Sequence, residues 1–203
     1  MLEARKEYKF IFSNYELEKF KMFLNSKESK LFNDRIISSL YMDTSDFKLY
    51  NLSIENDIDK YKVRFRQYNN ENEIFQEIKL NTQEGKQKII NKQNNFKNLD
   101  DIDQIRYKNL DLVPAIKISY KRSYFNFRNV RITIDKNLQF ESTKNHSMSK
   151  NKLLSKFNIV EYKILHQRKP DIESSFFQNP VSFSKYNYGI ENLYNLKPTI
   201  FVV

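Results

Sequence analysis

Charged side chains recur at every second residue in several short segments of this sequence. In 62–66, lysine and arginine alternate with apolar residues, and in 5–9 an acid lies between two bases at the same spacing. Because alternate residues of a β-strand face the same side of the sheet, each set forms one charged face. Enclosed in a barrel, such faces would suit a polyanion and a metal ion. The segments with this pattern are 5–9, 62–66, 77–79, 120–122, 131–135 and 161–163.

The bases on these faces are candidates for binding phosphate, because guanidinium groups bind phosphate oxygens in pairs and lysine adds a mobile charge. A simpler interpretation is an open sheet whose half-exposed bases pair with acids on neighbouring strands. The segment 62–66 argues against it, because its three bases have no acid between them. Such a repulsive row is expected only where an anion fills the space. The strongest candidates are Arg64, Arg66, Arg122 and Arg131, with Lys9, Lys62, Lys79 and Lys163 beside them.

Acids share these faces with the bases. They could neutralise the bases or hold a divalent cation, since Mg²⁺ and Mn²⁺ commonly bind one or two carboxylates together with substrate phosphates. The chain offers no plausible protein nucleophile, so phosphoryl transfer would be direct and driven by positioning and charge neutralisation. The acids are Glu7, Glu77, Asp135 and Glu161.

Composition limits the chemistry open to the chain. Its 203 residues suit a single domain spanning 1–203, and its net charge of +10 attracts phosphate-bearing partners. It has no cysteine and only two histidines, His146 and His166, which argues against thiolate chemistry, histidine-bound zinc and serine–histidine catalysis. With only two glycines it lacks a Walker loop, which excludes P-loop ATPases.

No apolar run reaches the roughly 20 residues that span a bilayer, and the N-terminus begins with charges instead of a signal-peptide core. A soluble, cytoplasmic protein is therefore expected.

Apolar periodicity predicts the elements that must position these charges. A helix is expected over 15–25, with a capping box formed by Ser13 and Glu16. The polar stretch 91–111 is either a surface helix or a long loop, 145–155 is a link with a possible helical turn, and 170–180 could be helical. Strands are expected over 8–12, 36–42, 61–68, 74–80, 115–127, 130–135 and 159–165.

This count of about seven or eight strands, joined mostly by short turns, predicts an α+β fold. The expected architecture is an antiparallel sheet closing toward a barrel, with a few peripheral helices. Small barrels usually fill their interior with apolar side chains, so a charged inner face requires that the barrel enclose solvent and ligand.

At these residues the chain resembles the catalytic domain of the vacuolar transporter chaperone (VTC) polyphosphate polymerases, members of the triphosphate tunnel (CYTH-like) metalloenzymes that also occur as stand-alone bacterial domains. The resemblance extends from Arg5 to Gly189. Its motifs, in order, are RKEYKF at 5–10, LYMDT at 40–44, KVRFRQY at 62–68, EIK at 77–79, YKR at 120–122, VRITID at 130–135, EYK at 161–163 and SKY at 184–186.

The resemblance implies a tunnel that binds ATP, triphosphate or polyphosphate and uses a divalent metal, Mn²⁺ or Mg²⁺. Arg5 stands where the wider superfamily has the first acid of its E-x-E-x-K signature, which favours the polymerase branch. Glu161 resembles the family's metal ligand, with Glu7 and Glu77 as further candidates. The implied phosphate ligands are Lys9, Arg64, Arg66, Lys79, Arg122, Arg131 and Lys185, and we expect Arg5, Lys62 and Lys163 to line the same tunnel.

The leading hypothesis is an enzyme, a metal-dependent polyphosphate polymerase that transfers the terminal phosphoryl group of ATP to a growing chain. A tunnel triphosphatase is the alternative within the same chemistry, and a noncatalytic binder of polyphosphate or RNA is the alternative outside it. Nucleic acid is disfavoured because Val63 and Phe65 lie on the face opposite the arginines, which suits a packed barrel exterior better than a base-stacking platform. Nothing in the sequence indicates the oligomeric state or the phosphoryl acceptor.

Overall fold

The computed structural model describes residues 5–27, 29–55, 60–69, 71–82, 85–128, 130–143, 151–165 and 180–196. Its strands are β1 (Arg5–Phe12), β2 (Lys30–Asp43), β3 (Lys60–Tyr68), β4 (Ile74–Thr82), β5 (Gly85–Gln93), β6 (Ile105–Tyr107), β7 (Leu110–Phe127), β8 (Val130–Ser142), β9 (Lys152–Leu154) and β10 (Asn158–Leu165). The helices are α1 (Asn14–Ser26), α2 (Lys48–Ile54) and α3 (Lys185–Leu193), with one 3-10 turn, η1 (Leu99–Asp101).

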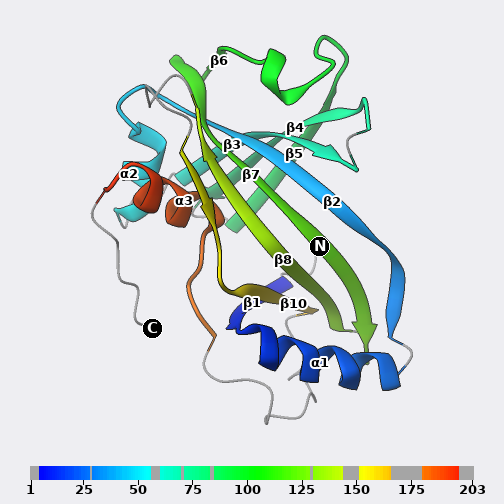
Figure 1. Cartoon of the computed structure of the whole chain (residues 1–203). Helices are drawn as coiled ribbons and strands as arrows, with labels where there is room; N and C mark the ends of the chain where they lie inside the picture. The colour runs from blue at the N-terminus through cyan, green and yellow to red at the C-terminus, as the bar shows by residue number, and fades with distance from the viewer. Residues whose placement is uncertain are drawn as a thin grey trace.

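The main sheet follows the order β1-β10-β8-β7-β2-β3-β4-β5, and every pair along it is antiparallel. The short strands β6 and β9 extend it beside β7 and β8. The long strands β2, β7 and β8 twist and curl, so the sheet forms a half-barrel with a concave face (Figure 1). The expected α+β fold with a curled antiparallel sheet is confirmed.

Helix α1 covers the convex face of β1, β10, β8 and β7. Its buried residues include Phe20 and Leu24, which join a core with Phe10 and Tyr162. The predicted capping box is present, because the Ser13 side chain accepts from the backbone of Glu16 and the Glu16 side chain accepts from that of Ser13. The predicted helix is thus confirmed, with bounds one residue wider at each end.

The convex face of β3 and β4 packs under the segment that contains η1. Val63, Phe65 and Ile78 are buried there against Leu99 and Ile102. The apolar residues of 62–66 therefore point away from the arginines, as the alternation predicted. A strand and its covering segment fix this orientation, because reversing it would bury charges against an apolar core.

The stretch 91–111 is neither a helix nor one long loop. Strand β5 runs to Gln93, η1 follows, and β6 forms a hairpin with β7. The strand expected over 115–127 is longer than predicted, because β7 begins at Leu110 and includes Pro114 at an irregularity in the β2–β7 register. Within the predicted link 145–155, residues 152–154 form the strand β9, whereas 145–150 lie outside the described residues. The possible helix over 170–180 also lies outside them, apart from residue 180.

Helix α3 was not predicted, because a glycine lies in its middle. It lies across one end of the concave face, with Ser184 as its N-cap. Gly189 is buried against β7 and β8, where a Cβ atom would overlap Ile116 Cδ1 and come within 2.8 Å of Phe140 Cδ1. Glycine allows the helix to lie this close to the sheet, because a larger residue would require the Ile116 and Phe140 side chains to shift.

Candidate functional site

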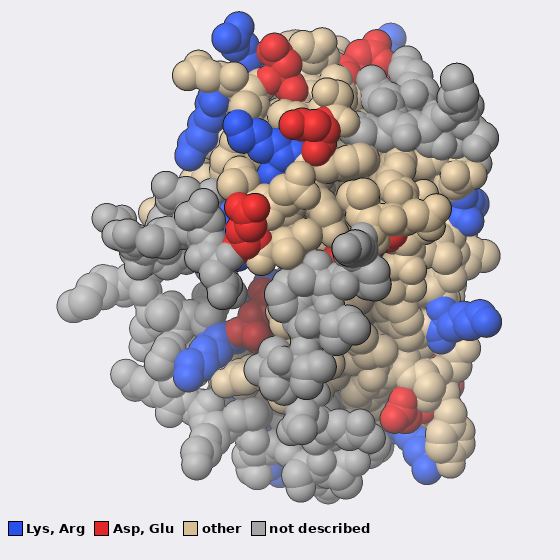
Figure 2. Space-filling model, turned by 90° about the vertical axis from the view of Figure 1, so that its left-hand side faces the viewer, with Lys and Arg blue, Asp and Glu red and all other residues tan. Residues whose placement is uncertain are grey.

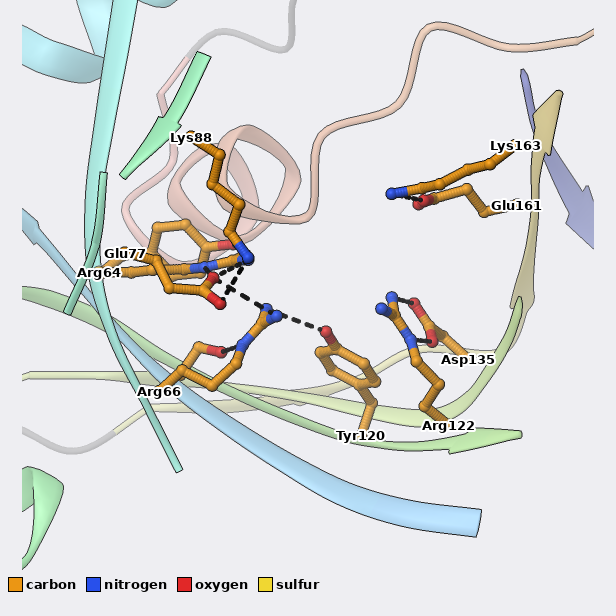
Figure 3. Close-up of polar contacts among 11 residues, drawn as sticks. Arg64, Arg66, Glu77, Lys88, Tyr120, Arg122, Asp135, Glu161 and Lys163 are labelled. Carbon is orange, nitrogen blue, oxygen red and sulfur yellow. Dashed lines mark hydrogen bonds and ion pairs between the residues drawn. The ribbon is translucent and has the colours of Figure 1, made fainter. Parts of the chain in front are cut away.

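Charged side chains from both walls and the floor of the half-barrel point into one space (Figure 3). One wall is formed by β3, β4 and β5, the floor by β2, β7 and β8, and the other wall by β10 and β1. The walls face each other closely enough to interact, because Lys79 on β4 contributes to the pKa of Glu7 on β1, and Glu161 on β10 contributes to that of Lys79. The sheet thus turns the predicted charged faces toward a common interior.

Glu77 is the centre of a charge cluster on the first wall. Its carboxylate accepts from Arg64 Nε at 2.7 Å, lies 3.5 Å from Arg66 Nη1 and contacts Lys88 Nζ at 2.8 Å. Burial raises the pKa of Glu77, but the three bases outweigh it and lower the pKa to about 2. The row 62–66 is therefore not left without an acid, as the sequence alone indicated, because the neighbouring strand supplies one.

Tyrosine hydroxyls hold the same two arginines. Arg64 Nη1 donates to Tyr41 Oη at 2.7 Å, and Arg66 Nη2 donates to Tyr120 Oη at 3.2 Å. Both guanidinium groups are largely buried, so their orientation toward the interior is fixed before any ligand binds. Preorganised donors of this kind bind phosphate without a reorganisation cost.

Asp135 links the floor to helix α3. It accepts two hydrogen bonds from Arg122, at 2.5 and 2.7 Å, and contacts Lys185 Nζ at 2.6 Å. Burial raises the pKa of Asp135, but Arg122 and Lys185 outweigh it and hold the pKa well below its usual range. One buried acid thus fixes two predicted phosphate ligands.

The second wall carries the predicted metal ligands. Lys163 Nζ lies 3.1 Å from Glu161 Oε1 and 3.4 Å from Glu7 Oε2, and Lys9 Nζ lies 3.5 Å from Glu7 Oε1. Burial raises the pKa of Glu7, but Lys163 and Lys9 outweigh it and lower the pKa to about 2. Lys163 therefore contacts the carboxylates of both Glu7 and Glu161.

Two bases of the site, Lys62 and Lys79, have a lowered pKa. Burial lowers the pKa of Lys62 to about 8, and its ammonium group donates to Ser184 Oγ and Asn187 Oδ1 on the α3 side, each at 2.8 Å. Burial of the ammonium group and the charge of Arg64 lower the pKa of Lys79, although solvent reaches the exposed residue and screens part of this effect. An entering anion would favour the charged form of both.

The remaining predicted bases are Arg131 on β8 and Arg5 on β1. Arg131 is exposed, with its guanidinium carbon 5.9 Å from the centre of the Tyr124 ring. Arg5 lies in β1, but its side chain is outside the described part of the structure. The space-filling view shows acidic and basic side chains interspersed over one side of the molecule (Figure 2).

The acids of the second wall fit a hard divalent cation. Glu7 and Glu161 supply carboxylate oxygens, the donors that Mg²⁺ and Mn²⁺ prefer, and substrate phosphates commonly complete such sites. Among the described residues, no group of three or more acidic, histidine or cysteine side chains converges on one point. Glu77 has less capacity for a cation, because three bases already surround its two oxygens.

Several polar residues of the site have no clear signal in the sequence. Lys88 lies on β5, whose polar composition hid the strand, although its bases alternate in 86–92. Asn187 lies in α3, a helix that was not predicted from the sequence. An open hollow at the edge of β4 and β5, lined partly by Glu73, Lys92 and Phe96, lies outside this charged space.

The fold is a curled antiparallel sheet, and its concave face carries the charged side chains of the candidate site. The protein-family model of the VTC domain matches residues 4–92 and 83–194, so this chain belongs to the VTC domain family. No match was found among curated proteins. No helix within the described residues is long and apolar enough to cross a membrane.

Two solved structures show the same fold. The PH1819 protein from Pyrococcus horikoshii OT3 has a TM-score of 0.50 and 14% sequence identity, covering 92% of this chain and 99% of that one. The PH1012 protein from the same organism has a TM-score of 0.50 and 11% identity, covering 85% of each chain.

Proposed function

We propose that the protein is a metal-dependent polyphosphate polymerase that uses ATP as phosphoryl donor. The observation that carries this proposal is that charged side chains from opposite walls face one space, with Lys79 on one wall near enough to Glu7 and Glu161 on the other for their charges to affect its pKa. A linear phosphate chain is the substrate that can contact both walls and the floor at once. Membership in the VTC domain family supports a triphosphate-type substrate.

In this proposal the first wall and floor bind the phosphate chain. Arg64, Arg66 and Arg122 have fixed guanidinium groups, and the mobile lysines add charge around them. An oxygen of the acceptor's terminal phosphate attacks the terminal phosphorus of ATP, and the bond to the ADP oxygen breaks. The bases stabilise charge on the transferred group and on the departing ADP.

Glu161 and Glu7 are the proposed ligands of the divalent cation, which would neutralise phosphate charge when bound. Lys163 shares both carboxylates and would move toward a phosphate when the cation enters. Glu77 and Asp135 are proposed to position the arginines.

The test is incubation of the purified protein with ATP and Mn²⁺, followed by gel electrophoresis stained for polyphosphate. A ladder of products is expected. Free phosphate without a ladder would indicate the triphosphatase, and neither product would indicate a binding protein.

Arg131→Ala should slow turnover about 10- to 100-fold, because loss of a charged hydrogen-bond donor costs about 1.5–3 kcal/mol.

The matched control is Lys121→Ala. Lys121 is exposed on the opposite face of β7 and contacts Asp34 at 3.3 Å, so its removal should leave turnover unchanged. Equal loss in both variants would mean that overall charge, not the tunnel, determines activity.

A further inference from the structure

Thr133 is a polar residue buried on the concave face of the sheet. The residue is 2% exposed, and its hydroxyl oxygen has no hydrogen-bond partner in the described part of the structure. A buried hydroxyl without a partner costs free energy, so such groups are rare unless a ligand or water satisfies them. The neighbouring residues Ile132 and Ile134 point into the opposite, convex core.

The strand register places Thr133 beside the proposed metal ligand. Thr133 on β8 is the direct cross-strand neighbour of Glu161 on β10, which in turn pairs with Lys9 on β1. Direct neighbours on one face have Cβ atoms about 4.5–5.5 Å apart. A hydroxyl and a carboxylate at this separation can share one cation, directly or through a water molecule.

Other charged groups around Thr133 are already engaged. Asp135, two residues along β8, is held by Arg122 and Lys185. Arg131, two residues in the other direction, is a cation and cannot accept from a hydroxyl. The Thr133 hydroxyl oxygen therefore lies next to Glu161 and is available to bind a cation.

We propose that the Thr133 hydroxyl is an oxygen ligand of the divalent cation held by Glu161, either directly or through a bound water. This inference rests on the proposed metal dependence but not on polymerase activity. It assigns a role to a residue that carries no charge, and it explains why a buried hydroxyl has no hydrogen-bond partner among the described residues.

The test measures Mn²⁺ binding without phosphate, by following the electron paramagnetic resonance signal of free Mn²⁺ during titration. Thr133→Val removes the hydroxyl and keeps the shape, and it should weaken Mn²⁺ binding about tenfold, as loss of a supporting ligand does in other metal sites. Thr133→Ser should bind like the parent. The melting temperature of Thr133→Val without metal should be unchanged or higher, because an unsatisfied hydroxyl is gone.

Ser123→Ala is the control, since Ser123 is a buried hydroxyl on the convex side of the neighbouring strand and should not affect Mn²⁺. Parent-like Mn²⁺ binding by Thr133→Val would overturn the proposal, as would equal loss in Thr133→Ser, which would point to packing. If valine impairs folding, Thr133→Ala makes the same comparison.

A parent that binds Mn²⁺ but forms no polyphosphate would overturn the proposed function and leave this inference standing. A parent that does not bind Mn²⁺ would overturn both.

Discussion

Glu77 shows how a single residue affects the charge of the concave face. Its carboxylate lies among Arg64, Arg66 and Lys88, and two of these bases are buried. In the free protein it therefore balances part of the charge that a phosphate chain would balance in the complex. Removal of one of these arginines would leave the buried Glu77 carboxylate with less compensation and should therefore destabilise the fold.

We expect Glu77→Gln to lower the free energy of unfolding by about 3 kcal/mol, because breaking a buried ion pair leaves uncompensated charge. Tripolyphosphate should raise the melting temperature of this variant more than that of the parent, since the ligand replaces the missing negative charge. Denaturant titration and thermal melting measure the two effects.

Glu73→Gln is the control, because Glu73 pairs with Lys92 on the exposed surface, where an ion pair contributes about 0–1 kcal/mol. If Glu77→Gln kept full stability but lost Mn²⁺ binding, Glu77 would be a metal ligand instead of a counter-charge for the arginines.

At the scale of elements, helix α3 completes the site that the sheet begins. Lys185 reaches Asp135 from the helix, and the α3 side also supplies the oxygens that hold Lys62. Tyr186 stacks on Tyr41, with ring centres 5.1 Å apart. The position of the helix therefore controls several bases at once, and Gly189 is the residue that allows this position.

Gly189→Ala should lower the free energy of unfolding by about 1–2 kcal/mol, because overpacking a core costs about 1–3 kcal/mol while alanine gains up to about 1 kcal/mol in helix propensity. It should also weaken tripolyphosphate binding, since Lys185 would move with the helix. Denaturant titration and calorimetry measure these effects.

Asn192→Ala is the control on the exposed side of α3 and should be close to neutral. Parent-like stability and affinity in Gly189→Ala would show that α3 tolerates displacement and does not position the bases.

At the scale of the whole molecule, the question is whether the net charge of +10 acts through an enclosed space or through the surface. A basic surface attracts any long polyanion and loses this attraction steeply with salt. A tunnel with fixed guanidinium groups favours a narrow phosphate chain and keeps part of its attraction, because buried charges are screened less.

Tripolyphosphate should therefore raise the melting temperature far more than single-stranded RNA at the same concentration, and the difference should persist between about 50 and 200 mM salt. Thermal melting with each ligand at both salt concentrations is the measurement. Equal shifts that vanish together at the higher concentration would contradict the tunnel and favour RNA binding.

Local alternation in the sequence determined which residues share a face. The bases of 62–66, the capping box of α1 and the apolar face under η1 follow from periods of two residues in strands and 3.6 in helices, which need no knowledge of distant segments. Strand β5 escaped prediction because both of its faces are largely polar, as an edge strand permits.

Only the tertiary structure decided which charges meet. Glu77 faces Arg64, and Thr133 faces Glu161, because particular strands are neighbours in a particular register. Helix α3 occupies the concave face because Gly189 fits against two residues more than 45 positions away in the chain. The sequence period specifies a face but not the partner strand, since pairing depends on contacts distributed over the whole sheet.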